Sequence, residues 1–148
     1  MAEETNQLRV RLVTPERTLF EHFVTAVELP AKNGYMEVLY GHAPLVAELG
    51  AGDVIIHGGT DSNAGGVAGG DQRYNVSWGF AEVLPDRVTI LASDALKPEE
   101  IDVTRANEQL ARGHKEWDEA GDREEAYTEA LRVIAEAEAK IASAAEKH

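Results

Sequence analysis

The histidines are the residues of this chain best suited to acid–base chemistry or metal binding. They stand at five positions: His22, His42, His57, His114 and His148. No two of them have the short spacing of a local metal motif, so the sequence predicts no metal site. The absence of cysteine excludes a disulfide, a thiolate zinc site and a cysteine nucleophile. No GxSxG elbow occurs either, and the sequence therefore predicts no catalytic residue.

His42 lies in the stretch YGHAPL, where it could serve as a catalytic base, a metal ligand or a turn residue. Gly41 permits an unusual backbone angle, and Pro44 fixes its own φ. Between them the imidazole can donate a hydrogen bond to a nearby carbonyl. This setting favours a structural or interface histidine over a catalytic one.

Two further stretches could bind phosphate. Asp102 and Arg105 are three residues apart on one expected helix face, with Arg112 two turns on. They form either a surface ion pair worth a few tenths of a kcal/mol or a nucleotide site in which arginines pair with phosphates. The glycine-rich segment 58–70 lacks the Gly-Lys-Ser/Thr ending of a phosphate loop, which favours a hairpin tip.

Composition limits the partners. The chain has 148 residues, 43% of them hydrophobic, which predicts a folded core. Its net charge of −13 argues against nucleic acid and anionic lipid as partners. The charges are spread along the chain, so neither half is expected to hold a basic patch. An acidic N-terminus and the lack of a long apolar run predict neither a secretory signal nor a membrane span.

The first half reads as short strands separated by turn-formers, which predicts an antiparallel β-sandwich or barrel. In residues 8–13, apolar positions alternate with arginines, as in a half-buried strand. The other expected strands cover 23–30, 35–39, 53–57, 73–77, 80–84 and 87–92. Expected turns include Gly50-Ala51-Gly52 and Pro85-Asp86.

The second half reads as an antiparallel helical hairpin. Pro98 and the acids after it predict a helix start, and Gly121-Asp122 predicts the break between two helices of roughly 20 residues. In both helices a large apolar residue alternates with Ala or Gly at steps of three and four. The predicted domains are therefore a β-sandwich at 1–97 and a hairpin at 98–148. So narrow an apolar stripe predicts a hairpin of marginal stability.

Several stretches in register resemble the epsilon subunit of the F-type ATP synthase. They are LVTPERTLF, VELPAKNGYMEVLYGHAPLVAELGAGDV, YNVSWGFAEVLPDRVTILASDA and EEIDVTRA. The resemblance implies a sandwich that binds the gamma subunit and the c ring, and a hairpin that can obstruct ATP hydrolysis by the alpha and beta subunits. It implies a non-catalytic subunit without a required cofactor, peripheral on the cytoplasmic face of the plasma membrane and attached only through the complex.

The resemblance also implies site residues. The gamma and c-ring interface falls on Tyr35, Met36, Glu37, Gly41, His42 and Pro44, and a regulatory ATP contact falls on Ile101, Asp102, Arg105 and Arg112. Tyr35 stands where the family often has a glutamate against the c ring. Glu136 stands where a base is expected on the second helix, and a carboxylate facing phosphate repels it. We therefore expect weak ATP binding at best and a weaker brake than usual. The alternative is an autonomous ATP sensor.

Overall fold

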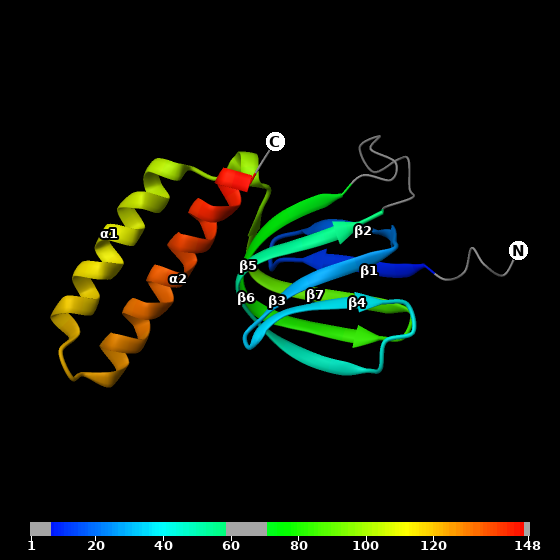
Figure 1. Cartoon of the computed structure of the whole chain (residues 1–148), viewed down its shortest axis with the longest axis horizontal. Helices are drawn as coiled ribbons and strands as arrows, with labels where there is room; N and C mark the ends of the chain where they lie inside the picture. The colour runs from blue at the N-terminus through cyan, green and yellow to red at the C-terminus, as the bar shows by residue number, and fades with distance from the viewer. Residues whose placement is uncertain (1–6, 59–70, 147–148) are drawn as a thin grey trace, which may run out of the picture. The chain divides into compact units, whose positions relative to one another are not determined.

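Seven β-strands form the N-terminal part of the chain in the computed structural model, which describes residues 7–58 and 71–146 (Figure 1). The strands are β1 (Leu8–Val13), β2 (Thr18–Val24), β3 (Ala26–Ala31), β4 (Gly34–Leu39), β5 (Leu45–His57), β6 (Gln72–Leu84) and β7 (Arg87–Leu96). They pair in the order β2-β1-β7-β6-β5-β3-β4 and fold over into a β-sandwich. The predicted sandwich is confirmed. The glycine-rich segment and its expected hairpin tip lie outside the described residues.

Two strands are longer than the sequence predicted. β5 and β6 have 13 residues each and pair with one another from Leu45–Val83 to Ile56–Gln72. The expected turn at 50–52 is wrong, because Gly52 continues the strand where a Cβ would lie 2.7 Å from the Pro30 Cβ. The two segments expected at 73–77 and 80–84 are one strand, with left-handed backbone at Trp78 (φ 53°) and Gly79 (φ 147°).

The pairing is not wholly antiparallel, which corrects the sequence prediction. β1 runs parallel to β7, with Val10 opposite Val88 and Leu12 opposite Ile90. Side chains alternate between the two faces of β1, so that Leu8, Val10 and Leu12 are buried while the arginines between them are exposed. The cluster that they join contains mainly leucine, isoleucine and valine from all seven strands. This single apolar core fixes the position of the outward side chains of the sandwich that are described below.

The C-terminal part is a helical hairpin of α1 (Val103–Ala120) and α2 (Glu124–Glu146), which confirms the prediction. Pro98 does not begin α1, because Pro98–Glu100 forms a short 3₁₀ helix and Ile101 is extended. Instead the Asp102 carboxylate accepts a hydrogen bond from the Arg105 backbone N–H at 3.1 Å and caps α1. The helix ends at Gly121 (φ 58°), and the Arg123 side chain donates to the carbonyls of Glu119 and Ala120.

Small residues make the closest contact between the two helices. Ala106, Gly113 and Ala120 of α1 are buried, as are Ala130 and Ala137 of α2. A Cβ at Gly113 would lie 2.8 Å from Cγ1 of Ile134 and 3.2 Å from Cγ1 of Val133. The large members of the expected stripes are more exposed, with Trp117 at 40% and Tyr127 at 39%. The hairpin therefore buries mainly methyl groups and backbone.

The two parts form separate compact units, Met1–Ala95 and Leu96–His148. Each has its own secondary structure and its own hydrogen bonds, and each is described here by itself. Across the residues that the structure describes, no helix is long and apolar enough to cross a membrane.

Candidate docking surface of the sandwich

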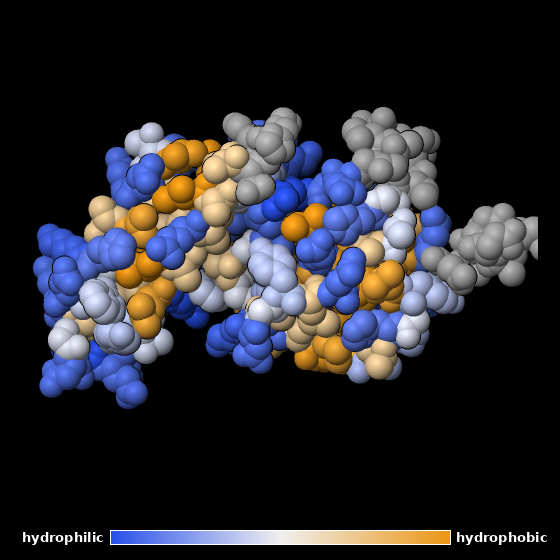
Figure 2. Space-filling view, in the orientation of Figure 1, coloured by the Kyte–Doolittle hydropathy of each residue, from blue (hydrophilic) through white to orange (hydrophobic). Residues whose placement is uncertain are grey.

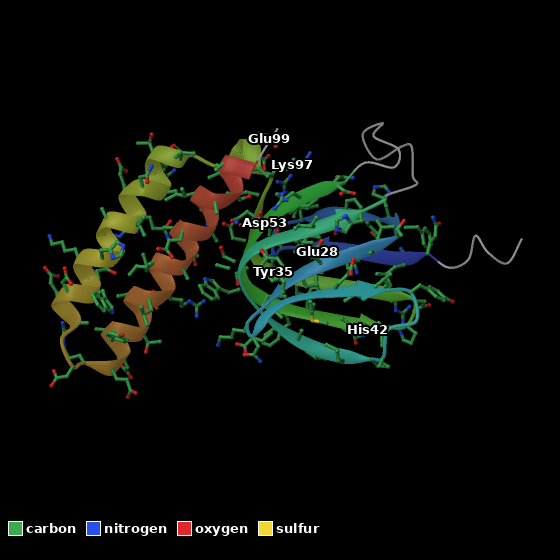
Figure 3. The ribbon with its side chains drawn as sticks, in the orientation of Figure 1. Glu28, Tyr35, His42, Asp53, Lys97 and Glu99 are labelled. Atoms are coloured by element: carbon green, nitrogen blue, oxygen red, sulfur yellow. The ribbon has the colours of Figure 1, made fainter. Side chains whose placement is uncertain are left out.

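The connection between β4 and β5 holds His42 in a tight turn (Figure 3). Gly41 has φ 93° and donates its N–H to the Pro85 carbonyl at 2.7 Å, which places the connection beside the β6–β7 turn. The His42 Nδ1 lies 2.7 Å from the Ala43 carbonyl oxygen. Because a carbonyl only accepts, Nδ1 carries the proton, and the carbonyl contact expected from the sequence is present. A histidine held in this way helps to stabilise the conformation of the turn.

An exposed apolar patch lies on the outer face of β5, β6 and β7. We define the patch as Val46, Phe80 and Leu91, whose exposed fractions are 70%, 54% and 52%. Val46 pairs with Glu82, and Phe80 is two residues from Glu82 on the same face. Gly79 touches the backbone of Leu91, since a Cβ there would lie 2.0 Å from the Leu91 carbonyl oxygen. In Figure 2, hydrophobic residues likewise gather in places on a largely hydrophilic surface.

The sequence analysis did not single out this patch, although its signal was available. In FAEVL, Ala81 and Val83 face the core, so alternation sends Phe80 outward. A large aromatic residue at an outward strand position, with further exposed apolar residues beside it, indicates a surface that another molecule covers.

The other end of β4 carries Tyr35, on the same face as Glu37. Tyr35 is 57% exposed, while its hydroxyl accepts a hydrogen bond from the Asp53 backbone N–H at 2.8 Å. Partial burial at this point raises the pKa of the Tyr35 hydroxyl. Asp53 is buried, and its carboxylate pairs with Arg73 at 2.8 Å.

The six predicted interface residues thus fall into two groups. Tyr35 and Glu37 face outward from β4, and Met36 between them packs on the core. Gly41, His42 and Pro44 lie beyond the far end of the same strand. Six residues of strand span about 20 Å, so no small ligand touches both groups.

Glu28, Glu37 and His57 form a group on the outer face of β3, β4 and β5 that could hold a divalent cation. One ligand atom from each lies within 4.8 Å of the others, and Glu28 stands directly opposite Glu37. The imidazole is already engaged, with Nε2 2.6 Å from Glu28 and Nδ1 3.0 Å from Asp71. The bond to Glu28 is the main cause that raises the pKa of His57, and the bond to Asp71 adds to it. Spacing along the chain could not reveal this group, because three strands contribute it.

The residues expected to contact ATP lie at the start of the hairpin. Ile101 is buried, whereas Asp102, Arg105 and Arg112 are exposed. The Asp102 carboxylate binds the backbone of Arg105 rather than its guanidinium, so its role is to cap α1. Arg112 lies 3.9 Å from Glu116, one turn further along the helix. Glu136 accepts a hydrogen bond from Gln109 and joins the two helices.

A β-sandwich followed by a two-helix hairpin is also the fold of subunits in solved ATP synthases. A chain of the Euglena gracilis mitochondrial ATP synthase, in an OSCP/F1/c-ring structure, matches with a TM-score of 0.74 and 24% identity, over 93% of this chain and 81% of that one. A chain of the Tetrahymena thermophila central stalk and c ring matches with a TM-score of 0.51 and 15% identity, over 64% of this chain and 69% of that one. At these identities the likeness concerns the fold.

Sequence comparison defines the family. Residues 7–98 match the family described as ATP synthase, Delta/Epsilon chain, beta-sandwich domain. The ATP synthase epsilon chain of Koribacter versatilis is 40% identical over 74% of this chain and 71% of its own length. The ATP synthase epsilon chain of Solibacter usitatus is 42% identical over 74% of this chain and 75% of its own length. The chain belongs to the ATP synthase delta/epsilon family, and the resemblance seen in its motifs is confirmed.

Proposed function

We propose that the chain is a non-catalytic central-stalk subunit of a rotary ATP synthase. Its sandwich binds the gamma subunit and the c ring and so helps to couple ion flow to ATP synthesis. The observation that carries this proposal is the apolar patch beside the β4–β5 connection, on a sandwich of this family. Three large apolar side chains, each more than half exposed on one face, are typical of a surface covered by a partner protein.

The two groups of predicted interface residues suit two partners. We assign the group at Gly41, His42 and Pro44, together with the apolar patch, to gamma. We assign the end of β4 that bears Tyr35, Met36 and Glu37 to the c ring. The separation of the groups along β4 supports this division. In the complex the chain is peripheral on the cytoplasmic face of the membrane and reaches the lipid only through its partners.

The hairpin acts as a weak brake on ATP hydrolysis by the alpha and beta subunits, and ATP binds it weakly at best. The capping bond already uses the Asp102 carboxylate, and Glu136 places negative charge on α2. Calorimetry with ATP and the full chain tests the weak ATP binding, and a low-micromolar dissociation constant would contradict it. The weak brake is tested by measuring ATP hydrolysis by the complex with the full chain and with a chain stopped after Lys97. A several-fold rise on truncation would show a strong brake.

A pull-down from gently solubilised membranes of the source organism tests the proposal as a whole. The tagged full chain should recover gamma together with alpha, beta and c subunits. The double variant Val46→Asp, Phe80→Asp should lose them, because two buried carboxylates without partners oppose docking. Leu131→Asp, an exposed apolar residue of α2, is the matched control and should retain gamma. A wild-type chain that recovers no synthase subunit but binds nucleotide tightly would favour the ATP sensor instead.

A further inference from the structure

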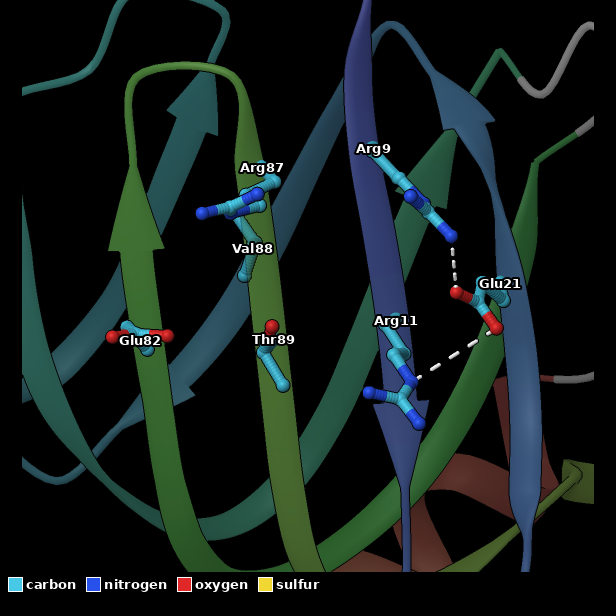
Figure 4. A pocket seen from close by; sticks show the side chains of 7 residues that line it. All are labelled: Arg9, Arg11, Glu21, Glu82, Arg87, Val88 and Thr89. Atoms are coloured by element: carbon cyan, nitrogen blue, oxygen red, sulfur yellow. Dashed lines mark hydrogen bonds and ion pairs between the residues drawn. The ribbon is translucent and has the colours of Figure 1, made fainter.

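Three arginines from two strands meet in a shallow pocket on the outer face of the sandwich (Figure 4). The arginine pocket has a volume of about 300 Å³ and is open to solvent. Its lining residues are Arg9, Arg11, Glu21, Glu82, Arg87, Val88 and Thr89. Three positive and two negative side chains give it a net charge of +1, in a chain whose net charge is −13. The expectation that neither half holds a basic patch is therefore wrong, because pairing brings residues 9 and 87 together.

The arginines are only partly neutralised. Arg9 lies 2.5 Å from the Glu21 carboxylate, and the Nε of Arg11 is 3.9 Å from the same group. Arg87 has no carboxylate partner among residues 7–58 and 71–146. It stands opposite Arg9 on the neighbouring parallel strand, and the two side chains point away from each other, with that of Arg9 directed toward Glu21 (Figure 4). The Arg87 guanidinium is therefore available to pair with a carboxylate from another molecule.

The pocket is continuous with the surface that we assign to gamma. The Arg9 N–H donates to the Asp86 carbonyl at 3.0 Å, in the turn whose Pro85 carbonyl receives the Gly41 N–H. On the other side, Glu82 of the pocket pairs across strands with Val46 of the apolar patch. A protein segment that covers the patch therefore reaches the arginines without crossing any other element.

We infer that the arginine pocket receives carboxylate side chains from an acidic segment of the protein that covers the apolar patch. The inference rests on the proposed function, which names that protein as gamma, and adds the chemistry of its contact. The pocket selects an acidic segment by bidentate pairing with guanidinium groups, while the patch supplies the apolar burial.

Carboxylates suit this pocket better than phosphates. Glu21 already shows how a carboxylate sits between Arg9 and Arg11. The pocket is also open and shallow, which suits the side of a polypeptide more than an enclosed small ligand.

Calorimetry of the full chain with its gamma subunit tests the inference. Charge reversal in Arg87→Glu should weaken gamma binding by about tenfold and make binding less sensitive to salt. Arg17→Glu is the matched control, since it makes the same charge change on an exposed residue outside the pocket. Neither variant should unfold below the wild-type temperature, because both side chains are exposed. Exchanging chloride for phosphate at equal ionic strength should leave binding unchanged.

The outcomes separate this inference from the proposed function. If Arg87→Glu and Arg9→Glu bind gamma like wild type while Val46→Asp with Phe80→Asp abolishes binding, the acidic contact is wrong and gamma docking stands. If Arg17→Glu weakens binding as much as Arg87→Glu, only overall charge matters and the inference fails. If phosphate competes with gamma, the pocket is a small-anion site and the inference is again overturned. If neither the patch variant nor the pocket variants lose binding, both the inference and the proposed function are overturned.

Discussion

The sandwich and the hairpin bury different kinds of side chain. The sandwich core consists mainly of large branched residues with almost no exposed surface, such as Leu12, Ile56 and Ile90. The hairpin buries Ala106, Ala130 and other small residues, while its large residues stay partly exposed. Because hydrophobic stabilisation scales with the apolar area removed from water, the sandwich is the stable unit. The hairpin holds its form with little burial and can open at low cost, as the proposed role of a brake requires.

The largest effect should follow from removing a core side chain of the sandwich. Ile90→Ala should lower the free energy of unfolding by about 2–5 kcal/mol, since it removes buried methyl groups and leaves a cavity. Urea unfolding followed by circular dichroism measures the change. The neighbouring Leu91→Ala is the control, because that side chain is 52% exposed. It should change stability by no more than about 0.5 kcal/mol while weakening gamma binding. Equal losses in the two variants would refute the assigned core.

A smaller and more local effect should follow from widening the hairpin. Gly113→Leu forces the helices apart at Ile134 and should cost roughly 1–3 kcal/mol of hairpin stability. Hydrogen exchange should speed up across residues 103–146 and stay unchanged in the sandwich. Ala111→Leu, on the exposed side of the same helix, should leave exchange as in wild type. Faster exchange in both units would mean that they do not unfold separately.

Loss of the helix cap should have a still smaller effect on the hairpin. Asp102→Ala removes the side-chain acceptor for the Arg105 N–H and should cost about 1 kcal/mol. Asp102→Asn retains an acceptor and should restore most of the stability, as measured by hydrogen exchange at the start of α1. If the two variants exchange alike, the carboxylate charge rather than the capping bond supports this end of the helix.

The smallest effect concerns the pH dependence of the sandwich. The folded-state pKa of His57 is raised by Glu28 and Asp71 above its unfolded value of about 6.5. The resulting stabilisation is fully present below that pH and is lost as pH rises through the folded pKa. In Glu28→Gln this loss should shrink, because the neutral amide favours the imidazolium less. Urea midpoints of the two proteins across this pH range measure the difference, and identical slopes would exclude the His57–Glu28 pair as its source.

Local patterns predicted the two units well, because alternation and helical spacing both follow from facing a single core. They failed where residues far apart in the sequence determine whether a segment forms a strand. Gly52 reads as a turn in isolation, yet it continues β5 because Pro30 and the Tyr35 hydroxyl leave no room for a side chain. Residues 18–22 were not recognised as a strand, because their pairing with β1 is not visible in their own short pattern.

The candidate sites show the same difference between neighbouring residues, whose contacts the sequence can predict, and distant residues, whose contacts it cannot. His42 could be judged from its neighbours, Gly41 and Pro44, and its carbonyl contact is local. The pairing of Arg9 with Arg87 joins residues almost a domain apart in sequence, so composition alone suggested that no basic patch existed. Glu28, Glu37 and His57 likewise meet only through the order of β4, β3 and β5.

The length of β5 and β6 has a mechanical consequence. They pair through hydrogen bonds in one register between residues 45–56 and 72–83, with an interruption at Gly50 and Trp78. A force that slides one strand along the other loads all these bonds together, so they must fail together rather than one after another. The sandwich should therefore resist shear forces directed along these strands, and it should deform more easily under forces directed across them. In the proposed role, a subunit that passes torque from one partner to another needs stiffness in that direction.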